Sequence, residues 1–101
     1  EIVKLVSEFP RNSSGFAISS QVVRSGTSIG ANVEEAQNAG SKKEFIRGMT
    51  IALKEARETL YWLRLITESR LIEKSLQALI DENLEIVKIL TTSVKKAKTK
   101  L

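Results

Sequence analysis

The sequence predicts an all-α protein. We expect a single domain, residues 1–101, folded as an antiparallel up-down-up-down four-helix bundle with a short or truncated first helix. Apolar residues recur at spacings of three and four along most of the chain, which is the period of an amphipathic helix. No stretch alternates apolar and polar residues as a half-buried strand would. The connections between the periodic segments are short, and short connections place consecutive helices side by side in opposite directions.

The first half of the chain predicts two helices separated by a turn. Residues 2–8 read as a short helix or the end of a longer one, and Pro10 marks its end. Residues 11–15 are rich in capping residues and predict a turn. A second helix is expected at 16–38, ended by Gly40. Its buried stripe comprises Ile18, Val22, Ile29, Val33 and Ala36.

Two glycines lie inside the predicted second helix. Gly26 and Gly30 each cost about 1 kcal/mol relative to alanine in a helix. Their spacing of four residues places them on one face, where they would let another backbone approach closely. Close packing inside the bundle and contact with a second copy of the chain both remain open at this point.

The third helix has a clear start in the sequence. Ser41 and Glu44 form the Ser-x-x-Glu pattern of a capping box, and the helix is expected to reach Glu68. Trp62 and Leu65 lie on a different side from its buried stripe. That stripe comprises Phe45, Met49, Ala52, Ala56, Leu60, Leu63 and Ile66.

A fourth helix is predicted after a connection at 69–74, capped by Ser75 and reaching about Lys98. Its apolar residues alternate spacings of four and three, as in a heptad seam. Asn83 is the single polar residue in this seam, where it either sets the register of the helix or tolerates a wet edge. The seam comprises Leu76, Ile80, Asn83, Val87, Leu90, Val94, Ala97 and Leu101.

A row of polar residues follows one side of the second helix. Arg24, Ser28, Asn32 and Glu35 are spaced by four, four and three, so they share one stripe. An arginine buried at such a place is tolerated only when it is paired and hydrogen-bonded. The best partners are Glu55 and Glu58 on the antiparallel third helix. We interpret these six residues as a structural polar network, not as a ligand or catalytic site.

The composition excludes several classes of enzyme. The chain has no Cys and no His, which removes disulfides, thiol nucleophiles and triads that need an imidazole base. Pairs of glutamates suggest a carboxylate metal site, but the di-iron helical bundles use Glu-x-x-His pairs. We therefore expect no catalytic residue, no metal, no cofactor and no small-molecule substrate. The lack of cysteine fits a cytoplasmic protein, and no apolar run approaches the roughly 20 residues of a membrane span.

Basic residues gather at two places in a chain of net charge +4. One group lies at the start of the third helix and the other near the end of the fourth. A solvated surface, with cations favoured at a helix C-terminus, explains them simply. The alternative is a phosphate-contacting patch that binds RNA or DNA weakly and with little sequence preference. The candidate contacts are Lys42, Lys43 and Arg47, then Lys95, Lys96 and Lys98.

Three segments carry a resemblance to a known family. Residues 21–36, 41–45 and 51–55, with Phe9 and Pro10 before them, resemble the bacterial four-helix-bundle proteins of the 23S rRNA-intervening-sequence family. The resemblance implies a bundle with a longer first helix, assembled into a ring-like homopentamer, and it implies no enzymatic activity. Related proteins that accompany the reverse transcriptases of diversity-generating retroelements are positively charged pentamers that bind nucleic acid.

The sequence leaves two kinds of function open. One is a basic accessory protein that binds nucleic acid. The other is a pentameric assembly or adaptor module that docks a protein partner. An enzyme is a distant third, because the sequence offers no group that commonly acts as a base near neutral pH.

Overall fold

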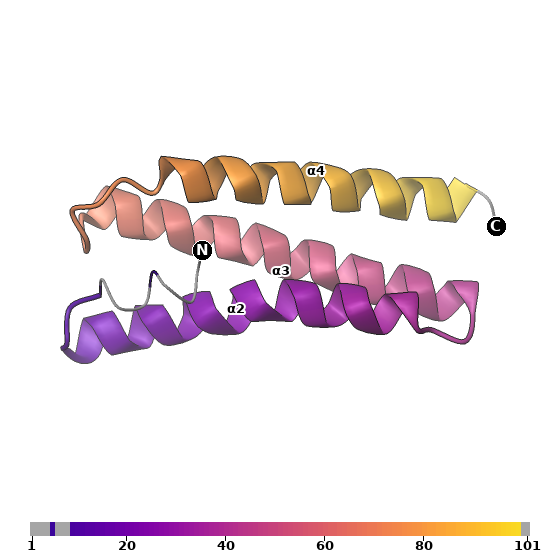
Figure 1. The fold of residues 1–101 in the computed structure, drawn as a ribbon, viewed down its shortest axis with the longest axis horizontal. Helices are drawn as coiled ribbons and strands as arrows, with labels where there is room; N and C mark the ends of the chain where they lie inside the picture. The colour runs from indigo at the N-terminus through magenta and orange to yellow at the C-terminus, as the bar shows by residue number, and fades with distance from the viewer. Residues whose placement is uncertain (1–4, 6–8, 100–101) are drawn as a thin grey trace.

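The computed structural model describes residues 5 and 9–99, and these contain helices but no strands. The helices are α2 (Ser13–Gln37), α3 (Lys42–Ser69) and α4 (Gln77–Thr99). They run up, down and up in an elongated body of 47 × 21 × 16 Å (Figure 1). The all-α class is confirmed for the described residues. The predicted first helix at 2–8 lies outside them, apart from Leu5.

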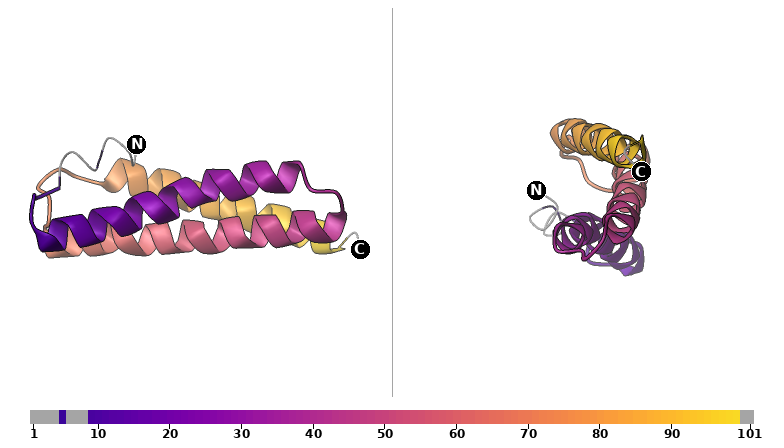
Figure 2. Two further views of the ribbon diagram at one scale, coloured as in Figure 1. Left: turned by 90° about the horizontal axis from the view of Figure 1, so that it is seen from below. Right: turned by 90° about the vertical axis from the view of Figure 1, so that its right-hand side faces the viewer.

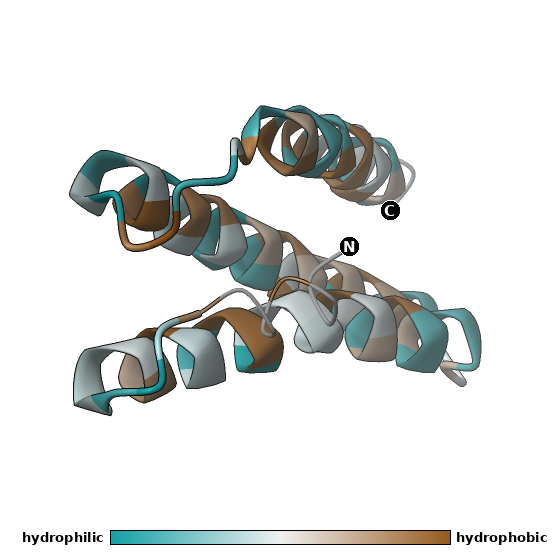
Figure 3. Cartoon of the chain, turned by 60° about the vertical axis from the view of Figure 1, so that its left-hand side comes forward, coloured by the Kyte–Doolittle hydropathy of each residue, from teal (hydrophilic) through white to brown (hydrophobic). Residues whose placement is uncertain are grey.

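Helix α3 is the central element. It packs against both α2 and α4, and the end-on view in Figure 2 shows the three helices as a curved layer. Apolar residues lie mainly on the sides of the helices that face their neighbours (Figure 3). None of the three described helices is long and apolar enough to cross a membrane.

The core consists of two clusters along the length of α3. One cluster lies toward the connection between α3 and α4 and includes Leu5, Phe9, Val22, Leu60, Leu63, Ile66, Ile72, Leu76 and Ile80. The other lies toward the connection between α2 and α3 and includes Ile29, Ala36, Met49, Ala52, Leu53, Ala56, Leu90 and Val94. Most of the predicted buried stripes fall in these clusters, because helical periodicity identifies the buried side of each helix directly.

Helix α2 begins three residues earlier than predicted. The Asn12 side chain accepts a hydrogen bond from the Gly15 backbone N–H at 2.8 Å and so caps the helix. Residues 13–15, predicted as a turn, are therefore its first turn. A side chain at Gly15 would collide with the Pro10 carbonyl group, so the preceding chain crosses this turn closely. The sequence indicated the capping residues, but it did not indicate which of them begins the helix.

The end of α2 also differs from the prediction. The helix stops at Gln37 and is capped by Asn38, whose backbone N–H donates to Glu35 and Ala36. Gly40 was expected to end this helix, but it lies three residues beyond Gln37, and none of the described glycines has a positive φ. Gly40 instead lies in the corner before α3, where its N–H donates to Glu44 Oε2 at 3.3 Å.

Helix α3 starts and ends close to the predicted places. Ser41 Oγ accepts from the Glu44 N–H at 3.1 Å, as a capping box requires. The other end closes on Arg70, whose φ of 55° is left-handed, and the Leu71 N–H returns to the Ile66 carbonyl at 3.3 Å. This closure is the kind of helix end that usually takes glycine, so the sequence did not indicate it.

One buried amide joins α4 to α3. Asn83 is 4% exposed, and its Nδ2 donates to the backbone carbonyl of Ala56 at 2.7 Å. A shift of α4 by one turn would remove the amide from this carbonyl and leave it unsatisfied inside the core. This geometry favours the register-setting role over a wet edge.

A close helix approach lies at Gly48, a glycine that was not predicted to allow one. A Cβ at Gly48 of α3 would lie 2.8 Å from the Ala36 Cβ, so α2 and α3 touch nearly backbone to backbone there. A Cβ at Gly30 would meet no described atom within 4 Å. Gly30 therefore admits no neighbouring helix of its own chain among the described residues, and its contact with a second copy stays a prediction.

Candidate functional site

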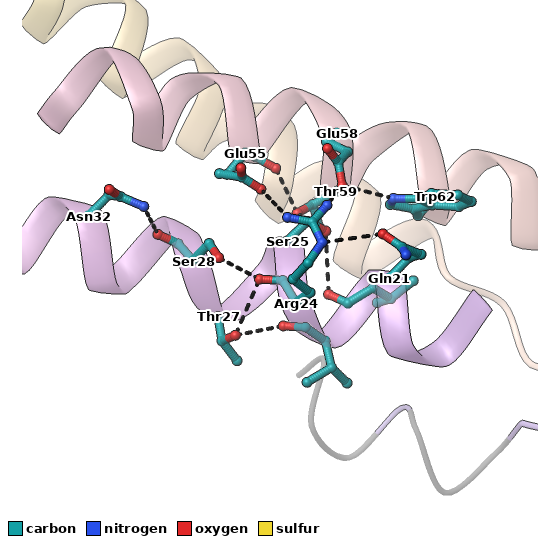
Figure 4. A network of polar contacts seen from close by, with 12 residues as sticks. Gln21, Arg24, Ser25, Thr27, Ser28, Asn32, Glu55, Glu58, Thr59 and Trp62 are labelled. Atoms are coloured by element: carbon teal, nitrogen blue, oxygen red, sulfur yellow. Dashed lines mark hydrogen bonds and ion pairs between the residues drawn. The ribbon is translucent and has the colours of Figure 1, made fainter. Parts of the chain in front are cut away.

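An arginine on α2 joins two glutamates on α3. Arg24 Nη1 donates to Glu55 Oε2 at 3.2 Å, and Nη2 pairs with Glu58 Oε2 (Figure 4). Its Nε donates to Gln21 Oε1 at 3.2 Å. Glu58 Oε2 also accepts the Trp62 indole N–H at 3.2 Å. The two glutamates are neighbours on one side of α3, three residues apart, so a single guanidinium reaches both.

The exposure of this cluster differs from the prediction. The Arg24 side chain is 46% exposed, against 14% for Glu55 and 31% for Glu58. The expectation of a buried arginine is therefore wrong, because the guanidinium bridges α2 and α3 at their surface. Exposed pairs contribute about 0–1 kcal/mol, well below the cost of breaking a buried pair.

A buried hydroxyl pair lies beneath these ion pairs. Ser25 and Thr59 are fully buried, and their hydroxyl oxygens lie 2.9 Å apart (Figure 4). The single proton of Thr59 is shared between Ser25 and the Glu55 carbonyl, which lies at 2.8 Å. Ser25 Oγ also lies 3.4 Å from the Val22 carbonyl. These contacts satisfy both hydroxyls and bring the helices close together.

The rest of the predicted polar row turns back onto its own helix. Ser28 Oγ donates to the Arg24 carbonyl at 2.7 Å, and Asn32 Nδ2 donates to the Ser28 carbonyl at 2.8 Å. Among the described residues, no hydrogen bond or ion pair joins Glu35 to this group. The row therefore splits into a cluster that crosses to α3 and a segment that does not.

Glu35 instead lines a cavity at the corner between α2 and α3. The cavity has a volume of about 470 Å³ and opens to solvent. Its lining includes acidic and basic side chains, two side-chain amides and the partly exposed Ile51. The lining residues are Asn32, Glu35, Ala36, Asn38, Ala39, Gly40, Glu44, Arg47, Gly48 and Ile51.

The two basic groups lie at the same end of the molecule. Because α3 and α4 are antiparallel, the first turns of α3 and the last turns of α4 end side by side (Figures 1 and 2). All six side chains are exposed. This end carries Lys42, Lys43, Arg47, Lys95, Lys96 and Lys98.

The acidic residues form no metal centre in the described part of the chain. Across residues 5 and 9–99, no group of three carboxylates, imidazoles or thiols comes together that could hold a metal ion. The glutamates of α3 that meet across the helix interface are occupied by Arg24 and Trp62.

The comparisons with known proteins agree with this architecture. The profile of the 23S rRNA-intervening sequence protein family matches residues 1–92. The chain belongs to this family. No functionally curated protein matches the sequence.

A solved structure resembles the chain over most of its length. It is the crystal structure of a protein of unknown function from the S23 ribosomal protein family of Bacteroides thetaiotaomicron VPI-5482. The two sequences are 39% identical, and the structures superpose with a TM-score of 0.84. The match covers 93% of this chain and 88% of that chain. The helical arrangement is therefore shared with a protein of the S23 ribosomal protein family.

The sequence predicted neither the Ser25–Thr59 hydroxyl pair nor the cavity at the corner between α2 and α3. A signal for the first existed, because Ser25 lies three residues after Val22 and Thr59 three after Ala56, inside the two buried stripes. The cavity had no comparable signal, because it depends on where two helices diverge near their connection.

Proposed function

We propose that the protein is a non-enzymatic member of its family that binds nucleic acid through the basic end of the bundle. The observation that supports this most is the meeting of two basic groups, separated by about half the chain, at one end of the helices. A cluster of exposed lysines and arginines is the electrostatic footprint of phosphate binding.

The local geometry favours phosphate at the start of α3. Lys42 and Lys43 occupy its first turn, where the backbone N–H groups and the helix dipole also favour an anion. Phe45, near these lysines, packs against the core, and the exposed Tyr61 is 19 residues beyond Lys42 along α3, or about 28 Å at 1.5 Å per residue. Binding to a duplex should therefore be electrostatic, with little preference between sequences.

The oligomeric part of the proposal rests on the family resemblance. We propose a closed four-helix bundle assembled as a homopentamer, in which five copies of a +4 chain carry +20. Repetition of a weak patch around a ring raises its apparent affinity through multivalency. Two large apolar side chains support self-association, because Phe16 is 63% and Ile89 is 61% exposed. A cytoplasmic location remains part of the same proposal.

A protein-docking adaptor is the second candidate. Tyr61 is 58% exposed and lies edge-on against Trp62, with ring centroids 5.1 Å apart. Tyr and Trp are enriched at the energetic centres of protein interfaces. This observation supports an adaptor whose partner docks on α3, away from the basic end.

One binding measurement distinguishes the two candidates. We expect the intact protein to retain duplex RNA and DNA at about 50 mM salt and to lose this binding steeply by about 200 mM. Light scattering after gel filtration, on the same sample, gives the oligomeric state. If no RNA or DNA is retained at the lower salt concentration, the adaptor becomes the better proposal.

A further inference from the structure

The exposed side of α3 carries an aromatic residue between two arginines. Arg57, Tyr61 and Arg64 are spaced by four and three residues, so they share one stripe of the helix, and all three are exposed. Within residues 5 and 9–99, neither arginine forms an ion pair. The half-buried Leu65 lies one turn beyond Tyr61 on the same side. The stripe therefore presents an apolar surface with a cation on either side of it.

The Tyr61 ring is supported by a series of contacts that begins on α2. Trp62 meets it edge-on, with ring centroids 5.1 Å apart, and the Trp62 indole N–H donates to Glu58 at 3.2 Å. Glu58 in turn pairs with Arg24 (Figure 4). An exposed aromatic side chain that is already oriented loses little conformational freedom on binding. Tyr, Trp and Arg are also the residue types enriched where binding energy concentrates in protein interfaces.

The acidic residues on this side of α3 restrict the kind of anionic partner. Glu68 is exposed and lies one turn beyond Arg64 in the same stripe, and the half-buried Glu58 borders Tyr61. A continuous chain of phosphates laid along α3 would meet these carboxylates, which disfavour it by like-charge repulsion. A short segment that places a carboxylate at each arginine is not subject to the same repulsion. The stripe is also separate from the basic end, since Arg57 lies 15 residues beyond Lys42, or about 22 Å along the helix.

We propose that this stripe docks an acidic amphipathic helix of a protein partner. Arg57 and Arg64 each pair with a carboxylate of that helix, and Tyr61 packs against an apolar side chain between the two carboxylates. The two arginines are seven residues apart, or about 10.5 Å. A partner helix matches this distance when its own carboxylates lie seven residues apart, with an apolar residue three or four positions from each. Such docking rests on the adaptor candidate and is independent of nucleic-acid binding at the basic end.

The test compares three labelled peptides by fluorescence polarisation. Each is an alanine-rich helix of about 16 residues. The first carries two glutamates seven positions apart and two adjacent leucines midway between them, so that it can dock in either direction. Glutamines replace the glutamates in the second peptide, and alanines replace the leucines in the third. The glutamate peptide should bind about fivefold more tightly than the glutamine peptide, which lacks both ion pairs, and about tenfold more tightly than the alanine peptide, which buries less apolar surface.

Matched pairs of substitutions assign the preference to the stripe. Arg57→Gln with Arg64→Gln should remove the preference for the glutamate peptide, whereas Lys74→Gln with Lys88→Gln should retain it. All of these side chains are exposed, and both variants lose the same charge, so a general electrostatic effect would appear in both. Tyr61→Ala should weaken binding of the glutamate peptide about tenfold, and Tyr61→Phe should restore most of it. Thermal unfolding of each variant shows whether it has folded.

The outcomes separate the acidic partner from the other possible occupants of the stripe. Equal binding of the glutamate and glutamine peptides overturns the acidic partner, and if that binding depends on Tyr61 the adaptor candidate stands. If the Arg57 and Arg64 substitutions weaken duplex RNA binding more than the Lys74 and Lys88 substitutions do, the stripe belongs to nucleic acid. If they change the oligomeric state in light scattering, it belongs to a second copy of the chain. Either result overturns the inference. Failure of all three peptides to bind overturns it too and leaves salt-dependent nucleic-acid binding in place.

Discussion

The two interfaces of α3 are built from different kinds of side chain. Toward α2, α3 presents a glycine, a buried hydroxyl and two glutamates, which meet Ala36, Ser25 and Arg24. Toward α4, the core receives large aliphatic side chains, including Ile80, Leu90 and Val94, with Asn83 as one buried polar group.

The difference shows two ways of fixing one helix against another. In the α3–α4 interface, apolar burial supplies stability but permits several registers, and one amide selects among them. In the α2–α3 interface, small residues bring the backbones together, so steric fit and short polar contacts select the geometry. The α2–α3 interface therefore leaves little room for added volume. The α3–α4 interface is sensitive to the loss of its polar contact.

The largest effect is expected from Asn83→Ala in the α3–α4 interface. This change removes the bond to the Ala56 carbonyl and leaves a small cavity in the core, at a cost of about 2–3 kcal/mol of unfolding free energy. Denaturant unfolding measures it. Asn83→Leu should recover part of the loss, because it refills the space that Asn83→Ala empties while the bond to the Ala56 carbonyl stays absent. Equal losses of unfolding free energy in both variants would contradict a contribution from the volume of the side chain at this position.

A smaller effect, with opposite signs at two sites, is expected from adding a methyl group to glycine. Gly48→Ala should destabilise by about 1–2 kcal/mol, because overpacking against Ala36 outweighs the gain in helix propensity. Gly30→Ala should stabilise by up to about 1 kcal/mol, because its Cβ enters open space. Thermal unfolding of the two variants measures the direction of each change in stability. Destabilisation at Gly30 would reveal a second backbone packed against it in the assembled protein.

The smallest effect is expected at the surface ion pairs. Arg24→Ala should cost about 1 kcal/mol or less, because the guanidinium is nearly half exposed. A double-mutant cycle with Glu58→Ala would measure the coupling, which should fall as salt concentration rises. A coupling of several kcal/mol that salt does not change would mean that the pair is buried in the assembled protein.

These contrasts show which parts of the fold the sequence could predict. Helix periodicity, the Ser41 cap and the partners of Arg24 follow from spacing along one helix and from the antiparallel order. The Gly48–Ala36 contact and the Glu35 cavity depend on the axial offset between two helices, and no single helix encodes that offset. The left-handed closure at Arg70 was missed because it occurs without glycine.

Whether the basic end contacts nucleic acid is the central question, and charge reversal at two matched pairs of lysines addresses it. The first pair is Lys42→Glu with Lys43→Glu at the basic end. The second is Lys54→Glu with Lys74→Glu, which lie in the middle of α3 and in the connection between α3 and α4. All four lysines are exposed, so both variants should fold, and both change the net charge equally.

Binding of duplex RNA over a range of salt concentrations, with the intact protein, is the measurement. The variant at the basic end should lose about tenfold or more in affinity, and its slope of log K against log salt should become shallower by about 2, one unit per lost phosphate contact. The control pair should stay within about threefold of the parent protein with an unchanged slope. Equal losses in the two variants would mean that overall charge drives binding, and would contradict a nucleic-acid interface at the end where α3 begins and α4 ends.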